Sequence, residues 1–411
     1  MKKLIKTLKN GMNIIAVHNP GLQSVGIAAC VKFGSIDENP KINGSAHYLE
    51  HMLFKGTKKR TWKDIGNKTR EFGIYSNAMT DFETTTYMMQ CYKTDLEKTM
   101  DLLSDQIKNS ILPKKEFNLE RGAIINENLM RLDNPGYFLY DVLPRTIFKK
   151  HPARMPISGD NDNTVKKIKR NDLLKIFKED YAPKNMALAI FGGSSVDNSL
   201  NIASKYFSDF NKTYAPKKRI IANEKQSKTK LVIKKPGLNN TIIGIGLKCN
   251  EFEISDLQEY AGLKIITQVL SNNLYDEIRE KRGFSYYSRA DLNSYSTFGF
   301  ISLISNSKPE NKNDVINIML DELEKIEKQK INKDDVKKVK RQIIVNNMML
   351  NEQSLYSAIQ LSTNKFLRGG NPFISEKIMN SVKSIKLDEI KKYSSKYINT
   401  DSYGLAIVEP K

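Results

Sequence analysis

The segment Val165-Lys-Lys-Ile-Lys169 recurs 217 residues later as Val382-Lys-Ser-Ile-Lys386, with four of the five residues identical. Beyond these two segments, Tyr181 is matched by Tyr397 and Leu188-Ala-Ile190 by Leu405-Ala-Ile407. Five-residue matches arise by chance in Lys-rich sequence, but an ordered series with one single-residue gap favours a duplication. Each copy has the pattern of a helix, a turn and a strand, and each ends about half of the chain. The sequence therefore predicts two similar domains.

A linker is expected between the two halves. At roughly 150 residues per domain, 411 residues allow two or three domains. The stretch around Pro216 is polar and Lys-rich, as is typical of a segment between domains. We therefore expect an N-terminal domain at residues 1–212, a linker at 213–230 and a second, homologous domain at 231–411.

Local patterns predict the fold class. Asn10-Gly11 tolerates the positive φ of a type I′ turn and lies between two apolar runs, which predicts a hairpin. Runs rich in β-branched and aromatic residues predict strands at 25–33, 76–80 and 84–91, and helical spacing predicts helices at 43–54, 62–72, 96–107 and 116–132. We expect an α+β fold in which each domain is a mostly antiparallel sheet with helices packed on one face, together forming half of a clamshell.

The charge balance allows several partners but selects none. Lys and Arg number 66 against 46 Asp and Glu, a net charge of +20. The excess could serve a nucleic-acid or membrane partner, or it could be a solvated Lys-rich surface. No known nucleic-acid-binding module accompanies it, and no window approaches the 18 or so apolar residues of a membrane span. We expect no nucleic-acid partner and no membrane span; whether the basic surface has another partner stays open. Three widely spaced cysteines and the lack of a secretory apolar run favour a cytoplasmic location.

The pentapeptide His47-Tyr-Leu-Glu50-His51 predicts a metal site. The chain has four histidines, and two of them lie four residues apart here, on one face of a predicted helix with Glu50 beside them. The order H-x-x-E-H is the inverse of the H-E-x-x-H zinc motif. A hydrolytic zinc site needs three protein ligands and one open position. The alternative is two histidines on a helix surface next to an acid.

A third ligand should come from another element. Glu120 and Glu127 are seven residues apart, close to two helical turns, so both would face the same way. One could be the ligand while the other supports a ligating histidine. Spacing alone leaves open which of them binds the metal.

The chain resembles the inverted-zincin peptidases of the pitrilysin, insulin-degrading enzyme and mitochondrial processing peptidase group, in its half-length form. The segment from Gly44 to Thr57, which contains the H-x-x-E-H motif, is similar to that family's active-site helix. The resemblance implies Glu127, 76 residues after the second histidine, as the third ligand and Glu120 as the supporting acid. It implies one Zn²⁺ per chain, held by His47, His51 and Glu127, with Glu50 as the catalytic base.

Two further segments carry the resemblance. Gly73-Ile-Tyr-Ser-Asn77-Ala78-Met-Thr80 is similar to the family's G-G-x-x-N-A-x-T strand, except for Ile74, and implies that Asn77 and Ala78 contact an added substrate strand. Arg279-Glu-Lys-Arg-Gly-Phe-Ser-Tyr286 is similar to the family's R-x-K-x-G-x-x-Y segment. It implies that Arg279 and Tyr286 bind substrate and that Tyr286 also stabilises the transition state. Without the resemblance, Arg279 has the pattern of a surface charge and Tyr286 that of half-buried packing.

The leading hypothesis is a zinc endopeptidase that hydrolyses unfolded peptides or presequences. The resemblance implies a chamber built from four domains, so a chain with two should pair with itself or with a paralogue. The alternative is a non-catalytic scaffold or partner subunit of a larger complex. Members of that kind typically lose the His/Glu set, which is intact here.

Overall fold

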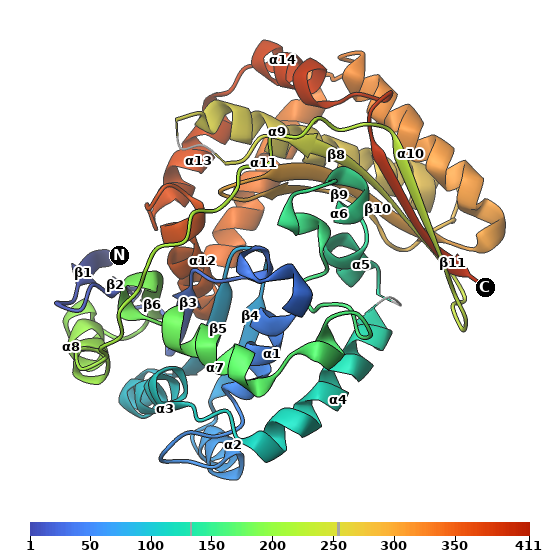
Figure 1. Cartoon of the computed structure of the whole chain (residues 1–411). Coiled ribbons are helices and arrows are strands. Elements are labelled where there is room, and N and C mark those ends of the chain that lie inside the picture. The colour runs from blue at the N-terminus through green and yellow to red at the C-terminus, as the bar shows by residue number, and fades with distance from the viewer. Residues whose placement is uncertain (132–133, 253–254) are drawn as a thin grey trace. The chain divides into compact units, whose positions relative to one another are not determined.

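The computed structural model describes residues 1–131, 134–252 and 255–411, and the chain forms two compact units (Figure 1). The first unit comprises Met1–Asn128, Ile157–Lys218 and Met348–Phe373; the second comprises Leu129–Pro156, Arg219–Asn347 and Ile374–Lys411. They differ from the expected continuous domains 1–212 and 231–411 because residues 129–156 pack with the second unit and residues 348–373 with the first. Each unit has its own sheet and its own apolar core.

The first unit is built on a six-stranded sheet in the order β1-β2-β6-β3-β5-β4. Strands β2 and β6 are parallel, and the other neighbouring pairs are antiparallel. The expected hairpin across Asn10-Gly11 is confirmed, because β1 pairs with β2 and Gly11 has a φ of 89°. The strands are β1 (Lys2–Thr7), β2 (Asn13–His18), β3 (Ser24–Val31), β4 (Tyr75–Thr80), β5 (Thr85–Tyr92) and β6 (Met186–Gly192).

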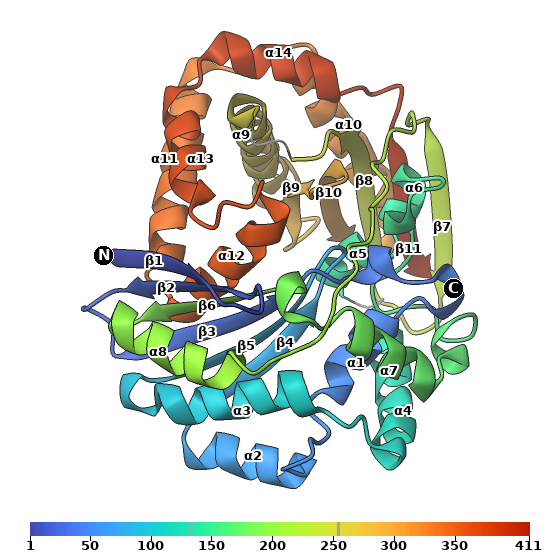
Figure 2. The ribbon, with the colours of Figure 1, turned by 60° about the vertical axis from the view of Figure 1, so that its left-hand side comes forward.

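Helices cover both faces of this sheet, whereas the sequence predicted helices on one face only. Alternate residues of a strand point to opposite faces, so Ile14 joins the main core while Ile15 joins a second cluster. That second cluster is completed by Ala358 and Leu361 of α12, which lies on the face opposite α3 and α8 (Figure 2). The helices are α1 (Ser45–Met52), α2 (Trp62–Glu71), α3 (Leu96–Asn109), α4 (Lys114–Arg131, in this unit up to Asn128), α7 (Arg170–Glu179), α8 (Val196–Phe207) and α12 (Ser354–Leu367).

The close approach of α12 to β3 gives a stability prediction. A Cβ added at Gly26 would lie 2.3 Å from the backbone oxygen of Ser354, so Gly26→Ala should cost about 1–3 kcal/mol of overpacking. Gly122, exposed within α4, has nothing within 4 Å of an added Cβ. The same substitution there should stabilise the protein by about 0.5–1 kcal/mol. Urea unfolding of both variants measures the difference, and equal effects would contradict the packing of α12 on β3.

The second unit has a five-stranded sheet in the order β7-β11-β8-β10-β9. Strands β7 and β11 are parallel and the remaining pairs are antiparallel. The order and directions of these five strands repeat those of β2-β6-β3-β5-β4 in the first unit. This confirms that the two units contain similar sheets. The strands are β7 (Thr229–Lys235), β8 (Thr241–Cys249), β9 (Ser288–Ser294), β10 (Gly299–Ser307) and β11 (Gly404–Pro410).

This second sheet is also covered on both faces. The main core packs β8, β10 and β11 against α9, α10, α11 and α14. On the other face, Gly244 lies against Phe138 of α5 and Gly404 against Thr146 of α6, both from the segment 129–156. The helices are α5 (Pro135–Asp141), α6 (Pro144–Ile147), α9 (Leu257–Leu274), α10 (Lys312–Glu327), α11 (Lys333–Asn351), α13 (Ile374–Ser384) and α14 (Leu387–Tyr397), with a π-helical turn η7 (Tyr275–Glu280) after α9.

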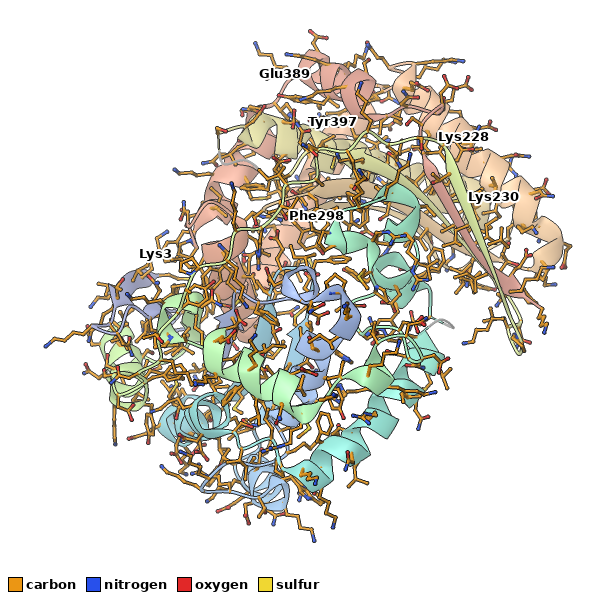
Figure 3. The ribbon with its side chains drawn as sticks, viewed as in Figure 1. Lys3, Lys228, Lys230, Phe298, Glu389 and Tyr397 are labelled. Carbon is orange, nitrogen blue, oxygen red and sulfur yellow. The ribbon has the colours of Figure 1, made fainter. Side chains whose placement is uncertain are left out.

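The repeated segment has the same structural role in both units. Lys169 and Lys386 are the N-caps of α7 and α14, and their backbone N–H groups donate to Asp172 and Glu389 at 2.8 and 2.9 Å. Figure 3 labels Glu389 and Tyr397 near the two ends of α14. Each helix is followed by an inner strand, β6 or β11, that carries the repeated Leu-Ala-Ile. The predicted helix–turn–strand pattern is thus confirmed in both copies.

Other local predictions can be compared directly. Thr61 caps α2 as expected, since its hydroxyl accepts from the N–H of Asp64. Residues 210–228 contain neither helix nor strand, and β7 begins at Thr229, inside the expected linker. The expected end of the helix 116–132 lies outside the described residues. In the described part of the chain, no helix combines the length and apolar character needed to cross a membrane.

Candidate metal centre

The helix α1 begins in a tightly built loop. Gly44, its N-cap, has a φ of 94°, and an added Cβ would lie 2.6 Å from the backbone oxygen of Ser158. The carboxylate of Glu38 accepts from the side chain of Asn43 and from the N–H groups of Gly44 and Ala46 at 2.6–2.8 Å. Burial raises the pKa of Glu38 to about 8, although these hydrogen bonds lower it. Glu38 therefore fixes the position of the first turn of α1 by hydrogen bonds.

The motif residues lie on one face of α1, as their spacing predicts. His47 and Glu50 are buried, with 6% and 8% of their surfaces exposed, and His51 is half-buried. The rings of His47 and His51 are 4.6 Å apart between centroids. The two imidazoles therefore lie side by side in one small site. The alternative, two histidines on a helix surface, is wrong.

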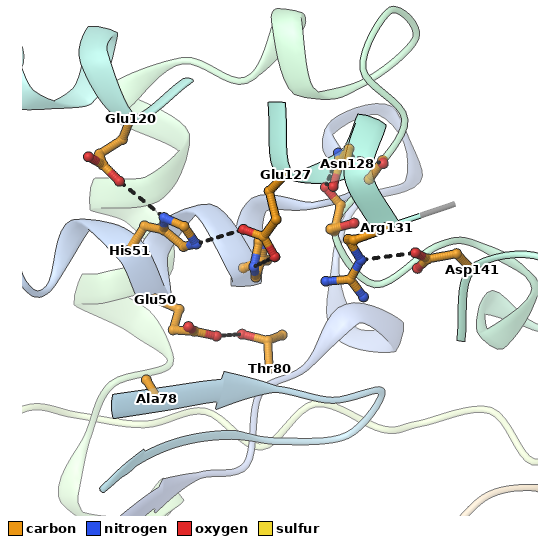
Figure 4. A network of polar contacts seen from close by, with 12 residues as sticks. Glu50, His51, Ala78, Thr80, Glu120, Glu127, Asn128, Arg131 and Asp141 are labelled. Atoms are coloured by element: carbon orange, nitrogen blue, oxygen red, sulfur yellow. Dashed lines mark hydrogen bonds and ion pairs between the residues drawn. The ribbon is translucent and has the colours of Figure 1, made fainter. Parts of the chain in front are cut away.

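Helix α4 supplies two acids to the same site (Figure 4). The carboxylate of Glu127 lies 3.6 Å from Nε2 of His47 and 3.4 Å from Nε2 of His51. One ligand atom from each of these three residues lies within 4.8 Å of the others. Two turns earlier, Oε2 of Glu120 lies 3.0 Å from Nδ1 of His51. The spacing argument left open which acid meets both histidines, and the geometry selects Glu127.

His51 lies between two carboxylates, and its electrostatics follow from that position. Burial alone would lower the pKa of His51, but Glu120 and Glu127 raise it to about 9. Burial would raise the pKa of Glu120, but hydrogen bonds from His51 and Lys55 hold it below the usual value. Nζ of Lys55 lies 2.6 Å from Oε1 of Glu120. The chain Lys55–Glu120–His51 therefore orients the imidazole so that Nε2 faces Glu127.

Glu50 is oriented by the neighbouring strand. The hydroxyl of Thr80 on β4 donates to Oε2 of Glu50 at 2.5 Å. Thr80 shares a face of β4 with Ala78, because alternate residues of a strand point the same way. The strand ends the sheet order, so no further strand of the described chain pairs with its outer edge. Asn77 is exposed on this strand, and its Oδ1 accepts from the N–H of Ala78 at 2.9 Å.

The donor set matches a known class of metal site. Two imidazole nitrogens and one carboxylate oxygen are the three protein ligands of several catalytic zinc sites, which keep a fourth position open. A carboxylate on the far nitrogen of a ligating histidine, as Glu120 provides for His51, is the usual support. The three side chains could therefore hold Zn²⁺ without rearrangement of the backbone.

The residues expected from the second half lie in the second unit. The guanidinium of Arg279, in η7, lies 4.9 Å from the ring centre of Tyr275 and 5.5 Å from that of Tyr286. Tyr286 is 88% exposed, so half-buried packing is the wrong description of it. The contact of Arg279 and Tyr286 with substrate stays a prediction.

Three residues of the site escaped the sequence analysis. Thr80 stands in the quoted strand segment, and period-2 alternation with Ala78 could have pointed to it. Glu38 precedes the loop before α1, where an acid near a helix N-terminus is a usable signal. Nothing in the local pattern distinguishes Lys55 from the other lysines around it.

Comparison with known proteins finds peptidase families and relatives named as proteases. Residues 13–161 match the family description "Insulinase (Peptidase family M16)", and residues 167–343 match "Peptidase M16 inactive domain". An uncharacterised zinc protease of Rickettsia felis is 27% identical over 99% of this chain and 97% of its own length. The β subunit of the mitochondrial-processing peptidase of Caenorhabditis elegans is 36% identical over 50% of this chain and 44% of its own.

Solved structures show the same fold. The crystal structure of a protease from Helicobacter pylori superposes with a TM-score of 0.88 at 21% identity, covering 100% of this chain and 99% of the other. The two family matches together cover most of the present chain, on both sides of residues 162–166. The chain belongs to the M16 family of peptidases.

Proposed function

We propose that this protein is a zinc-dependent endopeptidase that hydrolyses unfolded peptides or presequences. The observation that carries the proposal is the grouping of His47, His51 and Glu127 within 4.8 Å, beside the buried carboxylate of Glu50. The naming of full-length relatives as zinc proteases supports the same chemistry. One ion per chain is expected, since the chain contains no histidine after His151 and its second half therefore cannot repeat the motif.

His47, His51 and Glu127 would hold the metal. A Zn²⁺ ion in such a site supplies a Lewis acid that lowers the pKa of water toward about 7. Glu120 keeps Nδ1 of His51 engaged, which leaves Nε2 for the ion. Lys55 balances part of the acidic charge behind the site.

Glu50 is the proposed general base. Its carboxylate is buried next to the histidines, and the Thr80 hydroxyl holds one of its oxygens. The other oxygen can take a proton from the attacking water and later pass it to the leaving amine. Asn77 and Ala78 lie on the edge strand β4, where an extended peptide can add by main-chain hydrogen bonds. Arg279 and Tyr286 are proposed to bind the peptide, and Tyr286 to stabilise the developing oxyanion.

A second chain is part of the proposal. The peptide chamber of the family that the sequence resembles uses four domains, and this chain has two sheet-bearing units. We propose that it pairs with another copy or with a paralogue. The molar mass of the purified protein in solution tests this, and a monomer that is fully active would contradict it.

A non-catalytic scaffold or partner subunit is the alternative. It is favoured by the match of residues 167–343 to an inactive M16 domain. The His47, His51 and Glu127 group argues against it. A purified chain that takes up no zinc at neutral pH would favour the alternative.

The test uses the purified full chain with a mixture of unstructured peptides. Peptide fragments should appear in the untreated sample, disappear after treatment with a chelator, and return when Zn²⁺ is added. Metal analysis should find one zinc per chain. Cleavage that persists after the zinc has been removed would contradict the proposal.

Glu120 gives a graded prediction for metal binding. Glu120→Gln keeps the shape of the side chain but removes the charge that orients His51, so zinc affinity should fall about 10- to 100-fold. Competition with a chromophoric chelator measures the affinity. Glu116→Gln, one turn earlier on the same helix, is the matched control and should bind zinc as the unmodified protein does.

A further inference from the structure

A basic groove of about 710 Å³ lies at the start of α2, and the proposed reaction does not use it. It is lined by residues 55–64 together with Ile111, Pro113, Lys115, Glu116 and Leu119, and we call it the α2 groove. All of these residues belong to the first unit. Lys55 is shared with the metal centre, because its ammonium group pairs with Glu120.

Cations dominate the lining of the α2 groove. Arg60 is neutralised by Asp101 and Asp105. Four further lysines are exposed, and the structure shows no ion-pair partner for them in the described part of the chain: Lys58, Lys59, Lys63 and Lys115. The lining also contains two acids, Asp64 and Glu116. Four lysines without an ion-pair partner outnumber these two carboxylates, so the groove keeps a net positive charge of +2.

Large apolar side chains stand exposed among these lysines. Trp62 is 47% exposed, and Leu119 and Ile111 are 59% and 40% exposed. Nζ of Lys63 lies 5.6 Å from the Trp62 ring centre. A small inorganic anion would pair with the lysines but leave the apolar side chains exposed to water. An extended segment with carboxylates and apolar side chains would pair with the lysines and also cover the apolar surface.

We propose that the α2 groove binds acidic segments of extended peptides. The choice of a peptide rests on the proposed peptidase function. Nucleic acid fits less well, because its binding depends mainly on phosphate contacts, whereas the groove combines its lysines with two carboxylates and three exposed apolar side chains.

Helix α4 sets the distance between the α2 groove and the metal centre. Leu119 lines the groove and Glu127 lies at the metal centre, eight residues later on the same helix. At 1.5 Å per residue this is about 12 Å along the helix axis, which is the least distance between them. An extended chain advances about 3.3 Å per residue, so at least about four residues are needed to cover it. Substrates with acidic residues at least about four positions from the cleaved bond should therefore gain affinity from the groove.

The test uses the fluorescence of Trp62, the one tryptophan of the chain. The full chain carrying Glu50→Gln, which should not cleave the ligand, is titrated with an acidic peptide and with its Gln-substituted counterpart. The acidic peptide should change the Trp62 emission and the neutral one should not. Binding should weaken as added salt screens the charges.

Variants locate the binding surface. Lys58→Gln combined with Lys59→Gln should raise the Kd of the acidic peptide about tenfold. The matched control, Lys175→Gln with Lys178→Gln, removes two exposed lysines from α7 and should leave the Kd unchanged. Unchanged emission with the acidic peptide, or equal Kd values for the two double variants, would overturn the proposal. Tighter binding of a single-stranded oligonucleotide of equal charge would also overturn it.

Failure here is distinguishable from failure of the peptidase proposal. The unmodified protein and the groove variant are both given a neutral peptide substrate. Equal, chelator-sensitive cleavage by both keeps the peptidase function whatever the groove binds. For the acidic substrate, the groove variant should show a higher KM with the same kcat, because the lysines do not touch the reacting atoms.

Discussion

Glu50→Gln is expected to lower peptide cleavage by about 10²- to 10⁴-fold, the usual contribution of a general base, while zinc binding is kept. The glutamine side chain has the same shape and can still accept the hydrogen bond from Thr80. It cannot take a proton from water. Initial rates on an unstructured peptide and the zinc content of the same preparation are the two measurements.

The control for this variant is an acid of the same unit that faces solvent. Glu179→Gln, at the end of α7, should change neither rate nor zinc content. A Glu50→Gln protein that cleaves peptides within tenfold of the unmodified rate would remove Glu50 from the role of base.

His47→Ala is expected to weaken zinc binding strongly and to abolish cleavage. Zinc sites in small peptides contribute about 10–16 kcal/mol from four ligands, so one ligand accounts for roughly 3 kcal/mol, or about 100-fold or more in affinity. The buried alanine would also leave Glu127 with a single imidazole partner. Metal analysis after dialysis should find less than one zinc per chain.

The matched control is another histidine of the first unit. Nδ1 of His18 on β2 lies 2.9 Å from the backbone oxygen of Ser194, away from the metal centre. His18→Ala should keep one zinc per chain and the original rate. Together the variants separate the roles, since Glu50→Gln loses cleavage alone and His47→Ala loses zinc as well. Full zinc content in His47→Ala would contradict the ligand assignment.

Features that depend on neighbouring residues could be predicted from the sequence. The one-face arrangement of His47, Glu50 and His51 follows from their spacing on a helix. The hairpin at Asn10-Gly11 and the Thr61 cap follow from turn and capping chemistry. The repeated helix, turn and strand indicate two similar domains.

Contacts between distant segments could not be predicted in this way. Thr80 bonds to Glu50, and Lys55 bonds to Glu120, across 30 and 65 positions of the chain. Each is an ordinary polar residue in an ordinary local pattern. The α2 groove escaped for the same reason, because its lining joins residues 55–64 to the start of α4.

The sequence by itself determined the α+β class, the repeat and the residues of the metal motif, because each depends on the spacing of residues that are close together in the chain. The tertiary structure decided which acid meets the two histidines and where the compact units begin and end. The inner strands of both sheets are buried on both faces, so each sheet needs a cover on its second face as well. The covering helices come from the other half of the chain, α12 for the first sheet and α5 with α6 for the second. Burial of apolar surface depends on proximity in space and not on order along the chain, so this exchange leaves no local pattern.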